Sequence, residues 1–481
     1  MIYKNIFTYI AILIIMGSLG IVSCRVTTPY KTPVSDSSTV FRKVVKAGDS
    51  MSLADTSSIA AIPYSVFFTD TTLLTLINRA ITGNYDLQNA IKNIEYAQKT
   101  LHQAKLGNYP TVSINATGGI SRYSENSLNG LSISSSTGKS YVEDYNLNIQ
   151  ASWEADIWGK ISNRKEAALA SYLQTQEAAK AVQTQIVSGI AQGYYNLLML
   201  DAQLEITRKT LVLYDSTIFM TRLQRDAGQT TTLAVQQQIA ARQAAAESIP
   251  QLEQSIAIQE NAISILSGQM PGFIKRSVNL ANFTVADNLP AGIPATMISL
   301  RPDVRSSELA IRSAHAQTNI SKTNLYPSFS ITAQGGLNSY LFNNWFNLPG
   351  SLFALAAGAI TKPIFQQGKL KTQYQQSQIQ EAQAVISFKQ NVLVAVGEVS
   401  DALVKQEKLK EQQVIASQRV DTLQSTVKNA ILLFKSGMAT YLEIISAQSN
   451  ALQAQLNLAD IQRQHLSAMA DLYRSLGGGW K

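Results

Sequence analysis

The chain has 481 residues, of which 45% are hydrophobic, 15% charged and 8% aromatic. This balance excludes a disordered polymer and leaves room for about two or three ordinary domains. Basic residues exceed acidic ones by 40 to 32, but they are spread along the chain without a run of five or more, which disfavours a nucleic-acid-binding protein because such proteins concentrate basic residues on one face.

The N-terminus has the layout of a secretory signal that ends at the single cysteine. Lys4 precedes an apolar run from Ile6 to Met16, which is shorter than the ~20 residues of a membrane-spanning helix and typical of a signal peptide. The residues before Cys24 resemble a bacterial lipobox, which implies cleavage before this cysteine and its acylation. We therefore predict a lipoprotein signal peptide at 1–23 and a lipidated, extended segment at 24–69.

The rest of the chain contains two internal repeats with constant spacing over long segments. The first matching pair is 217 residues apart and the other two pairs are 209 apart. The pairs are Tyr109-Pro110 with Tyr326-Pro327, Gly159-Lys160 with Gly368-Lys369, and Gly228 with Gly437. The first copy therefore carries extra residues between its Tyr-Pro and Gly-Lys marks. They lie in the Ser-rich stretch Arg122–Tyr141, which we predict to be a loop.

Each repeat also predicts a pair of long helices. The stretches 162–226 and 370–436 lack proline and place apolar residues three and four apart, and at 1.5 Å per residue each would be about 100 Å long. A second helix is predicted to return after each of the glycines Gly228 and Gly437, so that the pairs are antiparallel. Pro250 is expected to kink or interrupt the first return helix. Taken alone, these helices are also compatible with a rod-like structural coiled coil.

Strands are predicted between the Tyr-Pro and Gly-Lys marks, where apolar and polar residues alternate with a period of two. The pattern is strict over 145–153, which begins and ends with an aromatic residue, and recurs over 112–117 and 329–334. A fourth candidate, 352–361, alternates poorly. Each is near the ~10 residues that a tilted strand needs to cross a membrane. An ordinary half-buried hairpin in a soluble protein is the alternative.

Four membrane strands cannot form a closed barrel by themselves. The smallest transmembrane barrels have about eight strands, and an open edge in lipid leaves backbone groups without partners. Several copies must therefore share one barrel if the strands lie in a membrane. Two copies would supply eight strands and three would supply twelve, and periodicity does not decide between them.

With these features together, the sequence resembles the TolC-like outer-membrane factor family, in its lipoprotein branch of efflux exit ducts. Five marks over nearly the whole mature chain carry the resemblance. They are the lipobox at Cys24; Asn84-Tyr85-Asp86-Leu87 opening a helix that ends at Tyr109-Pro110; Asp156-Ile157-Trp158-Gly159-Lys160; the paired glycines; and Leu289-Pro290-Ala291-Gly292-Ile293-Pro294 followed by Leu300-Arg301-Pro302-Asp303-Val304-Arg305 and Glu308. Within this last mark, Pro302 suits the first turn of a helix, and acidic residues follow near its positive end, so we interpret it as a structural helix start.

The resemblance implies a mainly α fold with membrane β structure. Three copies would form a helical α-barrel and a shared twelve-stranded transmembrane β-barrel, each copy contributing four strands. We expect the first repeat at 70–273, an inter-repeat linker at 274–300 and the second repeat at 301–481. The expected strands lie at about 111–121, 143–153, 328–338 and 351–362, and the expected long helices at about 160–268 and 366–476.

The implied function is passive conduction from a periplasmic adaptor and an inner-membrane transporter to the exterior. The cargo would be small toxic compounds or metals, and the implied partners are two further copies of the chain, the adaptor, the transporter and outer-membrane lipid. An exit duct for a secreted polypeptide uses the same architecture and is the first alternative. A structural lipoprotein rod without a pore is a second, which the alternating strands disfavour. Arg25, following the acylated cysteine, favours delivery to the outer membrane.

Candidate site residues lie where the helix pairs turn. Gly228 and Gly437 are the candidate adaptor-docking tips, since glycine permits a left-handed turn. The resemblance implies a constriction near the second tip, and Leu442 and Glu443 are its candidate gate residues. A ring of three Glu443 carboxylates should attract cations. The sequence departs from the family one turn later, where it has Ser446, so a second acidic ring is not expected.

Catalytic, cofactor and metal sites are not predicted. The three histidines, His102, His315 and His465, lie on separate helical segments without metal-like spacing to cysteine or carboxylates. The sequence contains no nucleophile elbow, phosphate-binding loop or nucleotide fingerprint. We interpret the histidines as surface or packing residues, and the chain as a protein that is not an enzyme.

Overall fold

The computed structural model describes residues 26–30, 62–280 and 301–481. The predicted signal peptide, Cys24, most of the 24–69 segment and most of the linker lie outside the described residues. None of the described helices combines the length and apolar character that crossing a bilayer requires. The described chain divides into two compact units. The sheet unit comprises 26–30, 95–173 and 309–386, and the helical unit comprises 62–94, 174–280, 301–308 and 387–481.

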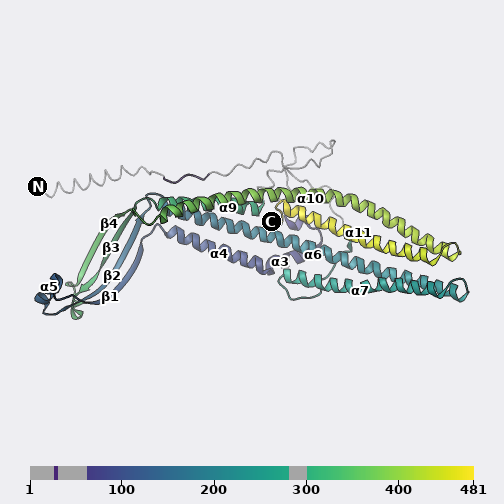
Figure 1. The fold of residues 1–481 in the computed structure, drawn as a ribbon, viewed down its shortest axis with the longest axis horizontal. Coiled ribbons are helices and arrows are strands. Elements are labelled where there is room, and N and C mark those ends of the chain that lie inside the picture. The colour runs from purple at the N-terminus through teal and green to yellow at the C-terminus, as the bar shows by residue number, and fades with distance from the viewer. Residues whose placement is uncertain (1–25, 31–61, 281–300) are drawn as a thin grey trace. The chain divides into compact units, whose positions relative to one another are not determined.

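The sheet unit contains one four-stranded antiparallel sheet, with strands in chain order β1-β2-β3-β4 (Figure 1). The strands are β1 Thr111–Arg122, β2 Tyr141–Ala155, β3 Ser328–Ser339 and β4 Leu352–Thr361. Pairing of β2 with β3 joins the two repeats in one sheet. β1 and β4 are its two edges, so each keeps one row of backbone groups that no described strand pairs. The four predicted strands are therefore present, including the poorly alternating fourth.

The two repeats contain helices of equal length. α4 Tyr85–Leu106 and α9 Pro302–Thr323 lead into β1 and β3. The long helices after β2 and β4, α6 Lys160–Asp226 and α10 Lys369–Lys435, each have 67 residues. The return helices, α7 Thr232–Leu266 and α11 Tyr441–Ser475, each have 35. The predicted antiparallel pairs are thus α6 with α7 and α10 with α11, each closed by a short turn (Figure 1).

The return helix of the first repeat is not interrupted at Pro250. α7 runs through the proline, so of the two expected effects, a kink or an interruption, the interruption is absent. A proline removes one backbone hydrogen bond of a helix, but α7 is packed on both sides of it. Ala245 is buried before it, and Leu252 and Ile256 pack against the main core after it. These contacts hold the helix together across the lost bond.

The Ser-rich stretch predicted as a loop contains a helix. α5 Leu128–Thr137 lies between β1 and β2. The side chain of Ser127 caps its start by accepting a hydrogen bond from the Gly130 N–H at 3.1 Å. Gly138 ends it in a left-handed conformation, with φ of 68°. The two caps compensate for the low helix propensity of the serines between them, and they were the signal that the prediction overlooked.

The main core lies in the helical unit, where the short helix α3 Thr71–Gly83 packs among α6, α10 and α11. Its side chains are mostly aliphatic, with Phe68, Tyr194, Tyr195 and Tyr473 as the aromatic members. Leu73 and Ile77 of α3 are fully buried, as are Ile190 and Leu197 of α6. Asp70 starts α3 by accepting hydrogen bonds from the N–H groups of the following turn. The core therefore ties the beginning of the first repeat to the long helices of both repeats.

The Arg-Pro-Asp mark also stabilises the helical unit, through an ion-pair network around the buried side chain of Arg301. The Arg301 side chain is 5% exposed and donates to Asp303 at 2.6 Å and to Glu398 of α10 at 2.7 Å. It also donates to the Ser475 carbonyl, at the end of α11, at 2.9 Å. Burial raises the pKa of Asp303, but the hydrogen bond and charge of Arg301 outweigh it, so that this pKa is lowered from its ordinary value. The mark is structural, as interpreted, and one arginine connects the start of α9 to both later helices.

Candidate functional site

The sheet has one apolar face on which side chains from all four strands line up. The register places these residues opposite one another, so that they share a face. The apolar rows are Val112 with Ala151, Ala333 and Ala356; Ile114 with Ile149, Gly335 and Ala354; and Ala116 with Leu147, Leu337 and Leu352. Ile114 is 70% exposed and Ile360 69% exposed. A broad apolar face left open to its surroundings is what a lipid-facing sheet requires.

The opposite face is polar and uncharged over the middle of the first three strands. Its rows are Thr111 with Ser152 and Thr332, Ser113 with Gln150 and Gln334, and Asn115 with Asn148. Asn115 donates to Asn148 at 3.3 Å, and the hydroxyl groups of Ser152 and Thr332 are 3.4 Å apart. Such a face suits contact with water, so the two faces together match the wall of an aqueous pore in lipid.

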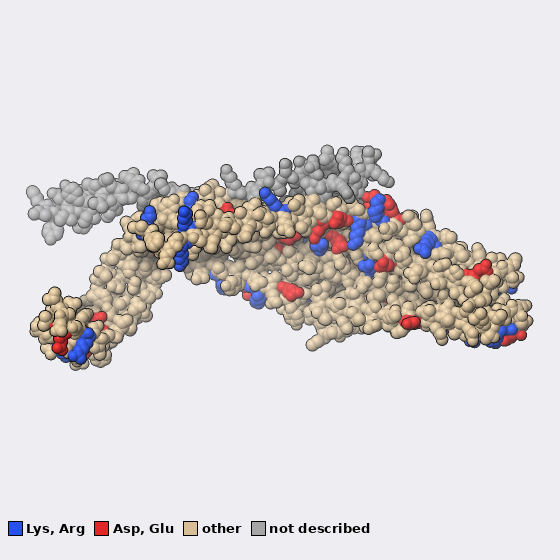
Figure 2. Space-filling model, viewed as in Figure 1, with Lys and Arg blue, Asp and Glu red and all other residues tan. Residues whose placement is uncertain are grey.

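Charged and aromatic residues mark the two ends of the strands. The only charged residues within the four strands are Arg122, Glu143 and Asp144 near the loop end and Glu154 near the helical end. Figure 2 shows the visible face of the strands without charged residues between these ends. Tyr145 and Trp153 are eight residues apart, about 26 Å along a strand. This length is close to the ~25 Å apolar band of an outer-membrane barrel.

The predicted tip glycines both lie in left-handed turns. Gly228 has φ of 72° and Gly437 has φ of 75°. The N–H after each glycine donates to a carbonyl five residues back, from Gln229 to Gln224 at 2.8 Å and from Met438 to Leu433 at 2.8 Å. This bond is the hallmark of the Schellman helix end. A Cβ added at either glycine would meet no other atom within 4 Å, so the turns are open to an external partner.

The helical unit brings the two tips together, which the sequence did not reveal. The Gln224 side chain of α6 donates to the Phe434 carbonyl of α10 at 3.3 Å, one turn before each tip. Met220 of α6 packs against a small core of α10 and α11 residues that includes Phe434 and Ile444. The tips of the two repeats therefore form one continuous end of this unit.

The candidate gate residues follow the second tip directly. Leu442 is 55% exposed. The Glu443 carboxylate accepts a hydrogen bond from the Thr440 N–H at 2.5 Å and completes a capping box at the start of α11. The corresponding residue in the first repeat is Ala234, which has no such side chain. Glu443 therefore has a structural role within one copy of the chain, besides the gating role that remains a prediction.

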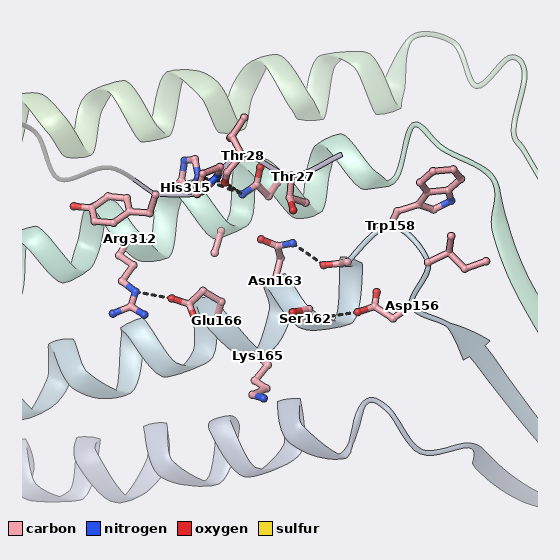
Figure 3. A pocket seen from close by; sticks show the side chains of 16 residues that line it. Thr27, Thr28, Asp156, Trp158, Ser162, Asn163, Lys165, Glu166, Arg312 and His315 are labelled. Carbon is pink, nitrogen blue, oxygen red and sulfur yellow. Dashed lines mark hydrogen bonds and ion pairs between the residues drawn. The ribbon is translucent and has the colours of Figure 1, made fainter. Parts of the chain in front are cut away.

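A contact that was not predicted holds the N-terminal segment, residues 26–30, against α9 (Figure 3). The Thr28 carbonyl lies 2.8 Å from His315 Nε2 and accepts from the Asn319 amide at 3.2 Å. Lys322 donates to the Val26 carbonyl at 2.9 Å. These three side chains, one turn apart on α9, form a latch for a segment that begins two residues after Cys24. His315 and Asn319 of the latch border a cavity of about 600 Å³ that is also lined by Arg312 of α9 and Glu166 of α6, which form an ion pair (Figure 3).

The other histidines occupy unrelated positions. His102 is exposed on α4. His465 is buried on α11, with its Nδ1 atom 2.9 Å from the Gln413 side-chain oxygen. Within 26–30, 62–280 and 301–481, no group of three or more His, Cys, Asp or Glu residues is arranged to hold a metal ion.

Comparisons with known proteins identify the same architecture. A family model described as outer membrane efflux protein matches residues 76–269 and 294–478. The solvent efflux pump outer membrane protein SrpC of Pseudomonas putida is 29% identical over 430 residues, covering 89% of this chain and 90% of that protein. The cation efflux system protein CusC of Escherichia coli O6:H1 is 27% identical over 419 residues, covering 87% and 88%. The structure of the outer-membrane channel OprN superposes with a TM-score of 0.84 at 22% identity, covering 95% of this chain and all of that one.

Proposed function

We propose that this chain, which belongs to the outer membrane efflux protein family, forms the outer-membrane exit duct of a tripartite efflux pump. The family match confirms the resemblance on which the sequence interpretation rested. The observation that carries the proposal is the four-stranded sheet, with one open apolar face and one uncharged polar face. The named relatives are efflux proteins, and none of these comparisons favours the export of a polypeptide.

The unpaired edge strands β1 and β4 are the reason that several copies of the chain would assemble. Neighbouring strands are antiparallel throughout, so the first strand runs opposite to the fourth. β4 of one copy can therefore continue the antiparallel pattern with β1 of the next, and each join pairs backbone groups that would otherwise lie unpaired in lipid. Three copies would give the twelve-stranded barrel that the family resemblance implies. The polar faces then line its lumen, and the apolar faces meet the lipid.

The helical unit would carry the duct into the periplasm. In this proposal the α6–α7 and α10–α11 pairs of three copies form a tunnel whose open end consists of the tips around Gly228 and Gly437. A periplasmic adaptor would dock there and connect the tunnel to an inner-membrane transporter, which supplies the energy. The exposed turns and the contact between the two tips support this role.

Two measurements test the proposed function. Purified full-length protein in planar bilayers should produce stable ionic currents, whereas a rod without a pore would produce none. Deleting the gene should sensitise cells to toxic small molecules without retaining a secreted polypeptide inside them. A deletion strain with unchanged tolerance but a blocked secreted protein would overturn efflux in favour of secretion. Co-purification of the membrane-bound complex would identify the adaptor and transporter.

The latch on α9 supports the proposed lipid anchor. Lys322 lies in the last turn of α9, which leads into β3 at Ser328. Cys24 precedes Val26 by two residues, about 7 Å of extended chain. Acyl chains on Cys24 would therefore leave the protein beside the helical end of the sheet, which in a periplasmic tunnel is the side of the inner leaflet.

Cys24→Ser is expected to yield a mature N-terminus without lipid, because the thiol accepts the acyl chain. Trimers should still form conducting channels, since a closed barrel holds the protein in the membrane independently of the anchor. Mass spectrometry of the N-terminus and bilayer recordings would measure both effects. Lys322→Met, which removes one latch contact, should keep the lipid and serves as the control. An unmodified Cys24 in the wild-type protein would contradict the anchor.

Glu443→Gln is expected to lower the cation selectivity of the channel and to relieve block by divalent cations added on the periplasmic side. A three-fold axis near the second tip would gather three carboxylates, and rings of acidic side chains attract cations. Glutamine can replace glutamate in a capping box, so this change removes the charge and keeps the hydrogen bond to Thr440. Reversal potentials and block constants in planar bilayers provide the measurement.

Glu443→Ala is the matched variant for this gate. It removes the hydrogen bond to the Thr440 N–H as well as the charge and should therefore also lower helix stability, while shifting selectivity as far as glutamine does. Equal selectivity and equal block in wild type and both variants would rule out an acidic gate and leave Glu443 as a capping residue.

A further inference from the structure

The fourth strand is apolar on both of its faces, unlike the other three. Residues 352–360 read Leu-Phe-Ala-Leu-Ala-Ala-Gly-Ala-Ile. The register with β3 places Leu352, Ala354 and Ala356 in the apolar rows of the sheet. The intervening residues belong to the opposite, polar face, where Phe353 pairs with Gly336, Leu355 with Gln334, Ala357 with Thr332 and Ala359 with Ser330. The poor alternation in the sequence therefore has a structural meaning, since apolar side chains enter a face that is otherwise polar.

Most of this second apolar face is open in the described chain: Leu355, Ala357 and Ala359 are exposed, and Phe353 is half-buried. Leu355 is 55% exposed, and the residue beside it on β3 is the polar Gln334. A strand with apolar residues on both faces is ordinarily buried on both. The larger side chains, Phe353 and Leu355, lie toward the loop end of β4, and the two alanines lie toward its helical end. The stripe thus widens toward the end that faces the exterior in the proposed duct.

The same face offers no charged group along its middle. Its acidic residues, Asp144 and Glu154, lie near the two ends of β2, and Glu154 is paired with Lys160 at 2.9 Å. Cation channels select ions with rings of acidic side chains, and conduction requires contacts that are favourable but weak enough to release the solute. An apolar stripe among uncharged amides and hydroxyls meets this condition for a neutral organic molecule and gives an ion no site.

We propose that Phe353, Leu355, Ala357 and Ala359 form an apolar stripe on the lumen wall, along which neutral, poorly water-soluble organic molecules leave the duct. This inference rests on the proposed function and specifies its class of cargo. Three copies would place three stripes around the lumen, separated by the polar faces of β1, β2 and β3. Phe353 and Leu355, the largest side chains of each stripe, determine its preference for neutral organic molecules.

The first experiment tests whether the stripe faces the lumen. Cys24 is the only cysteine and is acylated in the proposed mature protein, so an introduced cysteine is the only free thiol. In bilayers of full-length protein, a charged, water-soluble methanethiosulfonate should lower the current of Leu355→Cys. Ala356→Cys, the next residue on the opposite face, should not respond. A silent Leu355→Cys would show that another segment or copy covers the stripe and would overturn the proposal.

The second experiment tests the class of cargo. Benzyl alcohol, a neutral aromatic solute, should reduce the wild-type current more than glycerol, a neutral polar one. In Leu355→Asn, and more so in Phe353→Asn with Leu355→Asn, the concentration needed for this reduction should rise several-fold. Gln334→Asn changes the neighbour of Leu355 without changing polarity, and it should behave as wild type. Because every variant is measured in the same lipid, partition of benzyl alcohol into the bilayer does not affect the comparison.

The outcomes separate this proposal from the function on which it rests. Equal block by benzyl alcohol in the wild type and in Leu355→Asn would overturn the apolar stripe, while the currents themselves would still support a channel. Absence of current in the wild-type protein would instead overturn the proposed function. The single Leu355→Asn variant decides the question if the double variant does not assemble.

Discussion

Replacing Gly228 or Gly437 with leucine is expected to abolish efflux while leaving a folded channel that conducts in bilayers. Both glycines have a positive φ, and a Cβ there meets no other atom within 4 Å. The variant therefore incurs only the local cost of a left-handed residue, about 1–2 kcal/mol, which is too little to unfold helices with packed cores. The bulky side chain, however, projects from the surface that we assign to the adaptor.

The chain offers a matched control for this prediction. Gly368 has φ of 79° and equally open surroundings, but it lies just before α10 in the sheet unit. Gly368→Leu should carry the same strain and retain efflux. Toxic-compound susceptibility in a deletion strain and in vivo cross-linking to the adaptor provide the measurements. Normal susceptibility and normal cross-linking in the Gly228 and Gly437 variants would exclude docking at these tips.

Arg301→Met is expected to have the largest effect on stability, a loss of about 1.5–3 kcal/mol, because the buried arginine side chain makes hydrogen bonds to charged partners. The substitution leaves Asp303 without its cation and removes the donor to the Ser475 carbonyl. Glu398 keeps only the more distant Arg474, at 3.6 Å. Arg312→Met is the control, because the Arg312–Glu166 pair is partly exposed and such pairs contribute about 0–1 kcal/mol. Denaturant midpoints of the purified protein would compare the two variants.

The same network predicts how stability depends on pH. The pKa of Asp303 is lowered in the folded protein, so its contribution is complete above its unfolded pKa, which is ~3.9, and is lost as the pH falls through the folded value. The wild-type protein should therefore lose stability below about pH 4, and Arg301→Met should lose less over this range. Parallel acid profiles of both proteins would contradict the assignment.

The periodic features of the fold were predictable because they depend on local patterns. Equal spacing between the repeat marks anticipated helices of 67 and 35 residues in both copies, and the alternation over 145–153 anticipated β2. Alternation of apolar and polar residues indicates a strand, and apolar residues three and four apart indicate a helix. Each pattern therefore predicts the local backbone geometry without knowledge of distant contacts. The long helix pairs and the strands of the predicted fold follow from these two signals, whereas the trimeric barrels were implied by the family resemblance.

The features that escaped prediction depend on contacts distant in sequence or on single residues. Arg301 donates hydrogen bonds to Glu398 and to the Ser475 carbonyl, which are 97 and 174 residues away in sequence. No local sequence pattern indicates these partners. The latch side chains contact the backbone carbonyls of residues 26 and 28. Every residue has such a carbonyl, so the side chains at 26 and 28 do not reveal the contact. The apolar residues that β4 adds to the polar face of the sheet appeared in the sequence as poor alternation, but assigning them to that face required the register with β3.

The capping box at Thr440 and Glu443 makes the two tips chemically different, because the first repeat has Ala234 in place of the glutamate. Three copies would present six tips around one mouth, alternating between a kind with the glutamate cap and a kind without it. The repeats are thus quasi-equivalent in backbone but not in surface chemistry. A ring of partner subunits around that mouth would meet two kinds of neighbour in turn, so its own subunits would need to bind in two ways.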